Sequence, residues 1–318
     1  MKSTEWELID NGIEEIDVYD IETENHMFFG NDILIHNSVY INFSPIVEKY
    51  LKMSNTENMT RNELTDIIDK MCKKVENDCI MPAFARLQKS VNFYQDTLHM
   101  DREVICIPSE KTGYCGFWVA KKHYCLLVQD MEGYRFPENE PKQKSMGLYY
   151  VQSSCPEILQ KNLKDATRLM IEEGEEKVRE YCKQVKKEFM SKTVEDIAFP
   201  KSISDVLKFM DSNGNPIKGT PVHGKAAIFY NKLLDEYNLT KKYNKIKEMD
   251  KMNFLYLKPN PKEIDVIGFI EELPKEFDLE KYVDYDTHFE KAFRKPLDDM
   301  MVSVGWSLEK KASLRDLF

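Results

Sequence analysis

The tripeptide His36-Asn37-Ser38 combines three residue types that together can cut and rejoin a peptide bond. The side-chain amide of an asparagine can attack its own backbone carbonyl, which forms a succinimide and breaks the following peptide bond. The imidazole of His36 can assist by transferring a proton to the scissile amide, and the hydroxyl of Ser38 can first receive an acyl group. These residue types in this order are thus chemically able to support cleavage after Asn37, coupled to acyl transfer.

Two further matches precede this tripeptide, Val18-Tyr19-Asp20 and then His26. The tripeptide alone is adequately explained as a chance sequence on a strand end, but with the upstream matches several independent coincidences are needed. Together they resemble the C-terminal splicing motifs of inteins. The resemblance implies that Asn37 cyclises, that His36 assists it and that Ser38 is the acceptor nucleophile. It also implies that His26 and Asp20 form the supporting acid–base pair.

Residues 1–37 are much shorter than an intact intein, which also starts with Cys or Ser, so the resemblance is to the C-terminal half of a split intein. This segment holds ten acidic residues and one basic residue, a net charge of −9. Such a fragment is steered toward a basic partner fragment. The alternative interpretation of residues 1–37 is a solvated acidic leader with no partner fragment. The remaining residues hold 44 basic and 45 acidic residues, so the overall acidity does not argue against nucleic-acid binding.

The elements that must position these residues change in type along the chain. Residues 1–37 contain β-branched and aromatic runs that predict three short strands, too few to close a core without a partner. Apolar residues from about Thr60 recur at helical spacing and predict a helix that ends near Pro82 or continues beyond it with a kink. Residues 103–128 predict a small antiparallel sheet.

Helices are predicted for much of the rest of the chain. A serine cap, Pro156 in the first turn and an acidic residue predict the start of a long helix. Apolar residues then recur at helical spacing to about Met190. A second helix is predicted from Gly224 or Lys225 to Leu234, and a proline-containing helix near 287–303. The pattern predicts an α+β fold.

Three stretches after Asn37 carry a second resemblance. They are Ser38-Val39-Tyr40, the sequences from His99 to Glu103 and from Gly116 to Tyr124 with its K-K-x-Y pattern, and the C-terminal sequence from Lys310 to Phe318. They resemble the C-terminal palm and thumb of family B DNA polymerases of the T-even bacteriophage type. The resemblance implies an intein segment at 1–37, a palm part with an antiparallel sheet and helices at 38–150, and a mainly helical thumb with a tail at 151–318. It implies a phage protein located in the cytoplasm of the host cell.

The same resemblance implies roles for single residues. Asp101 and Glu103 would alternate along one strand, face the same side and act as auxiliary acids. Lys121, Lys122 and Tyr124 on a strand would hold the primer end, and Lys225 in a basic run at 218–251 would bind phosphate. Without the resemblance, the simplest interpretation of these residues is an exposed hairpin strand and a solvated helical face. The tail would bind a sliding clamp through three apolar residues, Leu314, Leu317 and Phe318. The simpler alternative is a tail that folds back on the thumb.

Polymerases of this family bind Mg2+ through aspartates that lie before the position of Ser38, so we expect those ligands on an N-terminal polymerase and intein fragment. The other expected partners are primer–template DNA and deoxynucleoside triphosphates, and the isolated chain is expected to be inactive. The absence of an 18-residue apolar run and of a signal-like start predicts a soluble, non-secreted protein with no membrane partner. Seven scattered cysteines predict reduced thiols, mostly in core positions, and no zinc site.

Two other functions stay open on the sequence. The first is a non-catalytic subunit that binds DNA or tethers a clamp, in which the acidic leader is a degenerate splicing remnant and the fragments associate without ligation. The second is a cytosolic α+β protein in which the motifs are chance matches.

Overall fold

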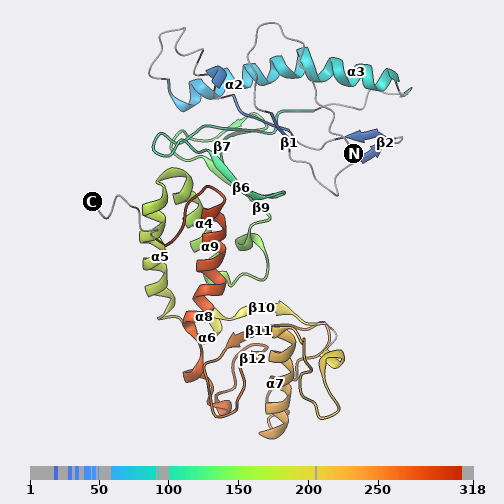
Figure 1. The fold of residues 1–318 in the computed structure, drawn as a ribbon, viewed down its shortest axis with the longest axis vertical. Helices are drawn as coiled ribbons and strands as arrows, with labels where there is room; N and C mark the ends of the chain where they lie inside the picture. The colour runs from blue at the N-terminus through green and yellow to red at the C-terminus, as the bar shows by residue number, and fades with distance from the viewer. Residues whose placement is uncertain are drawn as a thin grey trace. The chain divides into compact units, whose positions relative to one another are not determined.

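The computed structural model describes residues 18–20, 28–30, 33–35, 39–43, 45–47, 49, 59–90, 92, 100–204 and 206–309. These residues combine antiparallel sheets with separate groups of helices, in agreement with the predicted α+β class (Figure 1). The chain forms two compact units. Unit 1 holds residues 1–107 and 127–142, and unit 2 holds residues 108–126 and 143–318.

Short strands form the first part of unit 1, as predicted. They are β1 (Val18–Asp20), β2 (Phe28–Gly30), β3 (Ile33–Ile35) and β4 (Val39–Ile41). β2 pairs with β3, and β1 pairs antiparallel with β4, which lies beyond Ser38 in the chain. The first strand of the acidic segment therefore finds its partner in this same chain.

A nearly continuous helix follows in unit 1. It consists of α2 (Arg61–Val75), the π-helical turn η1 (Glu76–Ile80) and α3 (Met81–Ser90). Thr60 and Glu63 form a capping box at its start, because each side chain accepts the backbone N–H of the other. The sequence predicts that the helix either ends near Pro82 or continues beyond it, and in the structure it continues. The wider π turn just before Pro82 accommodates a residue that has no N–H and whose ring crowds the preceding turn.

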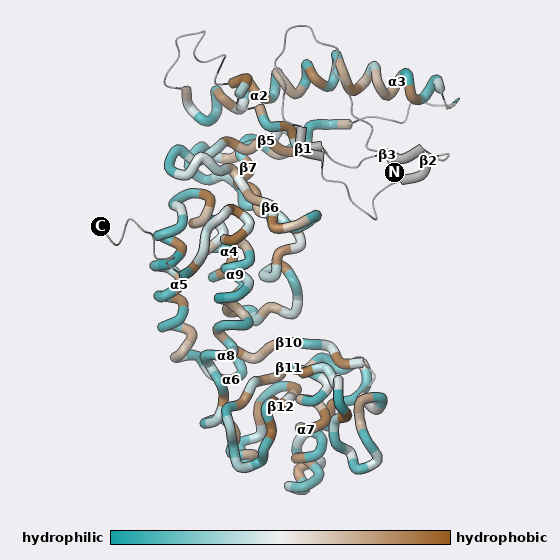
Figure 2. The backbone as a smooth tube through the Cα atoms, in the orientation of Figure 1, coloured by the Kyte–Doolittle hydropathy of each residue, from teal (hydrophilic) through white to brown (hydrophobic). Residues whose placement is uncertain are grey.

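Hydrophobic and hydrophilic positions alternate along α2 and α3 (Figure 2). Among the 30 residues of α2, η1 and α3, Thr65 alone is fully buried. Polar contacts rather than deep apolar packing therefore have a large part in holding this helix in unit 1.

An antiparallel sheet contributes strands to both units. Its strands are β5 (Val104–Cys106), β6 (Gly116–Ala120), β7 (His123–Met131), β8 (Tyr134–Arg135) and β9 (Lys142–Met146). β7 pairs with each of the other four. Seven successive residues of β7 are buried, and this confirms the predicted small antiparallel sheet.

Unit 2 continues with α4 (Glu157–Glu172) and α5 (Glu175–Phe189). The prediction of one long helix to Met190 is wrong, because Gly174 takes a φ of 90°, which ends the first helix and starts the second. The predicted serine cap is also wrong, since Pro156 occupies the N-cap and no side chain caps the helix.

A second sheet in unit 2 packs against α7. Its strands are β10 (Phe199–Ser202), β11 (Lys251–Tyr256) and β12 (Val266–Phe269), and it follows the short helix α6 (Val194–Ile197). α7 (Val222–Glu236) matches the helix predicted to begin at Gly224 or Lys225. A Cβ on Gly268 would lie 3.0 Å from the carbonyl oxygen of Ala226, so glycine permits the close approach of β12 to α7.

The last helical stretch is α8 (Tyr285–Phe289), the π turn η6 (Glu290–Arg294) and α9 (Lys295–Val302). This confirms the proline-containing helix predicted near 287–303, and again a π turn precedes the proline, Pro296. Short 3-10 turns complete the unit: η2 (Tyr149–Val151), η3 (Val206–Phe209), η4 (Lys275–Phe277) and η5 (Glu280–Tyr282).

All seven cysteines lie in the described residues and are free thiols, as predicted. The prediction that most of them fill the core is wrong, because only Cys125, Cys155 and Cys182 are buried and Cys79 is exposed. None of the helices in the described part of the chain combines the length and apolar character that a membrane span requires.

Candidate functional site

The predicted splicing residues Asn37, Ser38, His36 and His26 lie outside the described residues. Asp20 is the last residue of β1, and its backbone partner in β4 is Val39, the residue after Ser38. Directly opposed residues of antiparallel strands have Cα atoms about 4.5–5.5 Å apart. The strand pairing therefore brings the backbone of Asp20 to the chain position that follows the predicted cleavage site.

The two predicted auxiliary acids flank Arg102 at the entry to β5. Asp101 and Glu103 are exposed, whereas Arg102 is largely covered. The prediction that both acids lie on a strand is wrong, because β5 begins only at Val104. The segment is nevertheless held in place, since the carbonyl oxygen of Glu103 accepts the backbone N–H of Glu132 at 2.8 Å.

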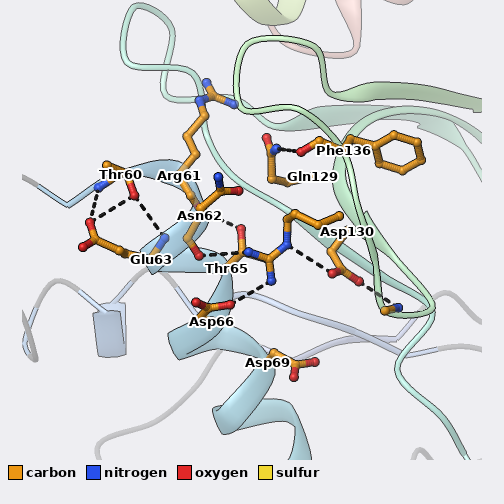
Figure 3. A network of polar contacts seen from close by, with 12 residues as sticks. Thr60, Arg61, Asn62, Glu63, Thr65, Asp66, Asp69, Gln129, Asp130 and Phe136 are labelled. Atoms are coloured by element: carbon orange, nitrogen blue, oxygen red, sulfur yellow. Dashed lines mark hydrogen bonds and ion pairs between the residues drawn. The ribbon is translucent and has the colours of Figure 1, made fainter.

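Arg102 belongs to an ion-pair network within unit 1, whose acids Asp66, Asp69 and Asp130 are drawn in Figure 3. Its Nε and Nη2 donate to Oδ1 of Asp69 on α2, at 3.1 and 2.9 Å. Its Nη1 donates to Asp130 on β7. The side chain of Arg102 is 16% exposed and that of Asp130 is 4% exposed. Arg102 therefore ties the segment between the two acids to both α2 and the sheet.

Arg135 on β8 is the second cation of the network. Its Nε donates to Oδ2 of Asp130 at 3.2 Å, and its Nη2 donates to Asp66 of α2 at 2.9 Å. The backbone N–H of Gly133 also donates to Asp130, at 3.0 Å. Asp130 is thus a buried anion shared by two guanidinium groups and the turn between β7 and β8.

The acids of this network stay ionised because of their partners. Burial raises the pKa of Asp130, but the hydrogen bonds from Arg102, Arg135 and Gly133 outweigh burial, so its pKa lies below the ordinary value of 3.8. The hydrogen bond from Lys73 is the largest influence on Asp69, and with Arg102 it lowers the pKa of that carboxyl too. These carboxylates are consequently engaged by arginine and lysine.

Magnesium would need a group of oxygen ligands that are available to it. Among the described residues, no three His, Cys, Asp or Glu side chains are grouped so as to hold a metal ion. The buried carboxylate of Asp130 is occupied by cations of the protein. The described residues therefore do not fit a magnesium site of their own.

The predicted primer-binding lysines form the turn between β6 and β7. Lys121 and Lys122 are half-buried, and the prediction that they lie on a strand is wrong because the chain reverses there. Tyr124 is on β7, is 5% exposed and lies opposite Trp118, with ring centroids 6.2 Å apart. The lysines are thus at a hairpin tip, and the tyrosine supports the hairpin from within.

Lys225 lies in the first turn of α7, whose N-cap Pro221 offers no side-chain hydrogen bond. Its Nζ is 3.7 Å from the carboxylate of Asp265. Burial and the nearby charge of Lys201 lower the pKa of His223 in the same turn. This end of α7 is therefore near the positive charges of Lys225 and Lys201, and Asp265 offsets part of that charge.

Half of the lysines in the basic run have polar partners within the chain. Lys225, Lys232, Lys242 and Lys245 contact Asp265, Asn215, Glu276 and Asp235, respectively. The tail residues Leu314, Leu317 and Phe318, predicted to bind a clamp, lie outside the described residues.

No protein-family model matches the chain. Over 89% of its length, however, the chain is 35% identical to the DNA-directed DNA polymerase of Enterobacteria phage T4, across 288 residues. It is 33% identical to the DNA-directed DNA polymerase of Escherichia phage RB69, across 289 residues. The chain spans 31% of the length of each of these relatives.

Over most of its length the chain is homologous to these two phage DNA-directed DNA polymerases. This homology confirms the polymerase resemblance in that part and excludes chance matches as the source of those motifs. It gives no support to the intein resemblance, which stays a prediction. The sequence places Arg102 between the two acids but indicates no role for it and no link to Asp130, because only the fold brings these residues together.

Proposed function

We propose that residues 38–318 are the C-terminal palm and thumb part of a phage-type DNA-directed DNA polymerase, and that residues 1–37 join this part to an N-terminal fragment by trans protein splicing. The observation that carries the polymerase proposal is the homology over 89% of the chain.

The splicing proposal rests on the order of residues at the junction. The acyl group of the N-terminal fragment leaves its bond to the N-terminal intein half and forms an ester with the Ser38 hydroxyl. The side-chain nitrogen of Asn37 then attacks its own backbone carbonyl and breaks the bond to Ser38, while His36 gives a proton to the departing amine. The freed amine of Ser38 finally takes the acyl group from its own hydroxyl, which forms the new peptide bond. The pairing of β1 with β4 supports a role for Asp20, because its backbone lies opposite Val39.

In the proposed polymerase, the N-terminal fragment supplies the magnesium ligands, since the described residues hold no suitable cluster. Magnesium there would align the primer hydroxyl and the triphosphate. In this chain, Asp101 and Glu103 are the proposed auxiliary acids, the turn at Lys121 and Lys122 the proposed primer contact, and Lys225 the proposed phosphate contact in the thumb. The three apolar residues of the tail would bind a sliding clamp.

Intact mass spectrometry tests both parts of the proposal. The chain is mixed with a polypeptide that carries an N-terminal intein half behind a polymerase sequence ending in Y-G-D-T-D. We expect a ligated product, a released peptide that ends in a succinimide at Asn37, and primer extension by the product but not by the separate chain. Asn37→Ala is the matched control, because it keeps the fragments able to associate but blocks cyclisation.

The sequence also leaves a second function open. In it, the chain is a non-catalytic subunit that binds DNA or tethers a clamp, and the fragments associate without ligation. Two unchanged masses in a mixture that forms a complex, with primer extension by that complex, would select this alternative. Primer extension by the isolated chain would contradict both functions.

A further inference from the structure

The turn between β6 and β7 holds a lysine in an unfavourable backbone conformation. Lys122 has a φ of 62°, in the left-handed region. A residue with a Cβ is sterically strained there, whereas glycine is not. A turn that only reversed the chain would be less strained with glycine at this position. Strain of this kind persists where the surrounding structure imposes it, and it is concentrated at sites that contact ligands.

Gly147, in the segment after β9, lies directly against this turn. It has a φ of 66°, and a Cβ on it would lie 2.4 Å from the carbonyl oxygen of Lys122 and 2.9 Å from Cδ2 of His123. Because the closest atom belongs to the backbone, a side chain at position 147 would require the backbone of the turn or of residue 147 to shift. The amide of Gln152 donates to the carbonyl oxygen of Gly147 at 3.2 Å and holds it in place.

Other glycines with positive φ show that this contact is particular to Gly147. Within the described ranges, a Cβ would meet nothing within 4 Å at five of them: Gly113, Gly133, Gly214, Gly219 and Gly305. Those positions need glycine for its backbone freedom alone. Gly147 needs it also because the lysine turn occupies the space of a side chain.

His123 fixes the turn from its other end. Its Nδ1 lies 2.7 Å from the carbonyl oxygen of Lys121, so the protonated nitrogen donates to that oxygen. Trp118 on β6 and Met146, which precedes Gly147, are 37% and 45% exposed. The two lysines are therefore held rigidly on a surface that also offers apolar area.

We propose that Gly147 is a positioning residue that sets the Lys121–Lys122 turn so that both ammonium groups contact phosphates of the primer–template duplex. The inference rests on the proposed function and extends it to residues that do not touch DNA. A turn fixed before binding loses less conformational entropy when the complex forms, so displacement of the turn weakens binding even when both lysines are present.

Fluorescence anisotropy of a labelled duplex with a recessed primer end tests the inference with the full chain at several salt concentrations. The reference is the double variant Lys121→Gln, Lys122→Gln, which we expect to bind about tenfold more weakly and to lower the salt slope by about two. We expect Gly147→Ala to reproduce most of this loss with both lysines intact. Gly113→Ala, with similar backbone strain and open space, should bind within about twofold of the unaltered chain.

Lys122→Gly provides a test that does not depend on how Gly147→Ala folds. It relieves the strained residue, so thermal unfolding should occur at the same or a higher temperature, while the salt slope of DNA binding falls by about one. Gln152→Ala, which adds no atoms, should weaken binding by a smaller factor than Gly147→Ala.

The outcomes distinguish the inference about Gly147 from the proposed function on which it rests. Loss of affinity in the double variant with unaltered binding by folded Gly147→Ala and by Gln152→Ala overturns the inference and leaves the proposed function standing. Unaltered binding by the double variant overturns the inference because the lysines then contact no phosphate. The ligation and primer-extension experiment tests the polymerase function independently of either result.

Discussion

Replacing the shared anion of the ion-pair network tests how α2 is held to the sheet of unit 1. Asp130→Asn keeps the volume of the side chain but leaves the guanidinium groups of Arg102 and Arg135 without a buried negative charge. Removing one partner of a buried ion pair costs about 3–5 kcal/mol. Here each arginine keeps a second carboxylate, Asp69 or Asp66, and is 16% or 30% exposed, which favours the lower end, about 3 kcal/mol.

Amide hydrogen exchange of α2 and of the β7–β8 hairpin measures this local cost. A loss of about 3 kcal/mol corresponds to exchange about two orders of magnitude faster, because each 1.36 kcal/mol is a factor of ten. Asp66→Asn is the matched control. Its side chain is 62% exposed in the pair with Arg135, so we expect a change below about 1 kcal/mol.

Equal exchange rates in the two variants would refute the argument that burial makes Asp130 the central anion.

The pH dependence of the stabilisation by Asp130 provides a second check. Since the pKa of Asp130 lies below its ordinary value of 3.8 in the folded protein, its stabilising effect is complete above that value and is lost as the pH falls through the folded pKa. The difference between Asp130→Asn and the unaltered chain should therefore shrink only in strong acid.

Three further predictions concern unit 2 and use urea unfolding followed by the fluorescence of Trp118 and Trp306. Burial lowers the pKa of His288 to about 4 from 6.5, so the neutral form is favoured in the folded state. The free energy of unfolding should therefore fall by about 2 kcal/mol between pH 7 and pH 5. An equal fall in His288→Asn would contradict this explanation. Leu163→Ala removes a side chain with 0% exposure from α4 and should cost about 2–5 kcal/mol; a loss below 1 kcal/mol would show that the site is not packed. Gly268→Ala places a Cβ 3.0 Å from the carbonyl oxygen of Ala226 and should cost about 1–3 kcal/mol, whereas unchanged stability would mean that β12 and α7 separate freely.

Local patterns were sufficient to predict many of the elements. The helix of α7, the antiparallel strands β5 to β7 and the proline-containing helix near the end of the chain follow from periodicity and turn residues, which act over a few positions. Local patterns failed where one residue interrupts a regular period. Gly174 divides what the apolar spacing presented as one helix, because its left-handed backbone conformation leaves no trace in the hydrophobic pattern.

The candidate site was predictable only in part, and for a physical reason. The sequence by itself determined that acids flank Arg102 and that two lysines adjoin each other, because these are neighbours in the chain. It did not determine that Asp130 binds Arg102, or that Gly147 packs against Lys122, since these residues are far apart in the chain and meet only when β5, β7 and β9 pair. Tertiary structure alone decided which charges are buried and which turn is rigid, because burial and steric contact depend on strands that the sequence does not place side by side.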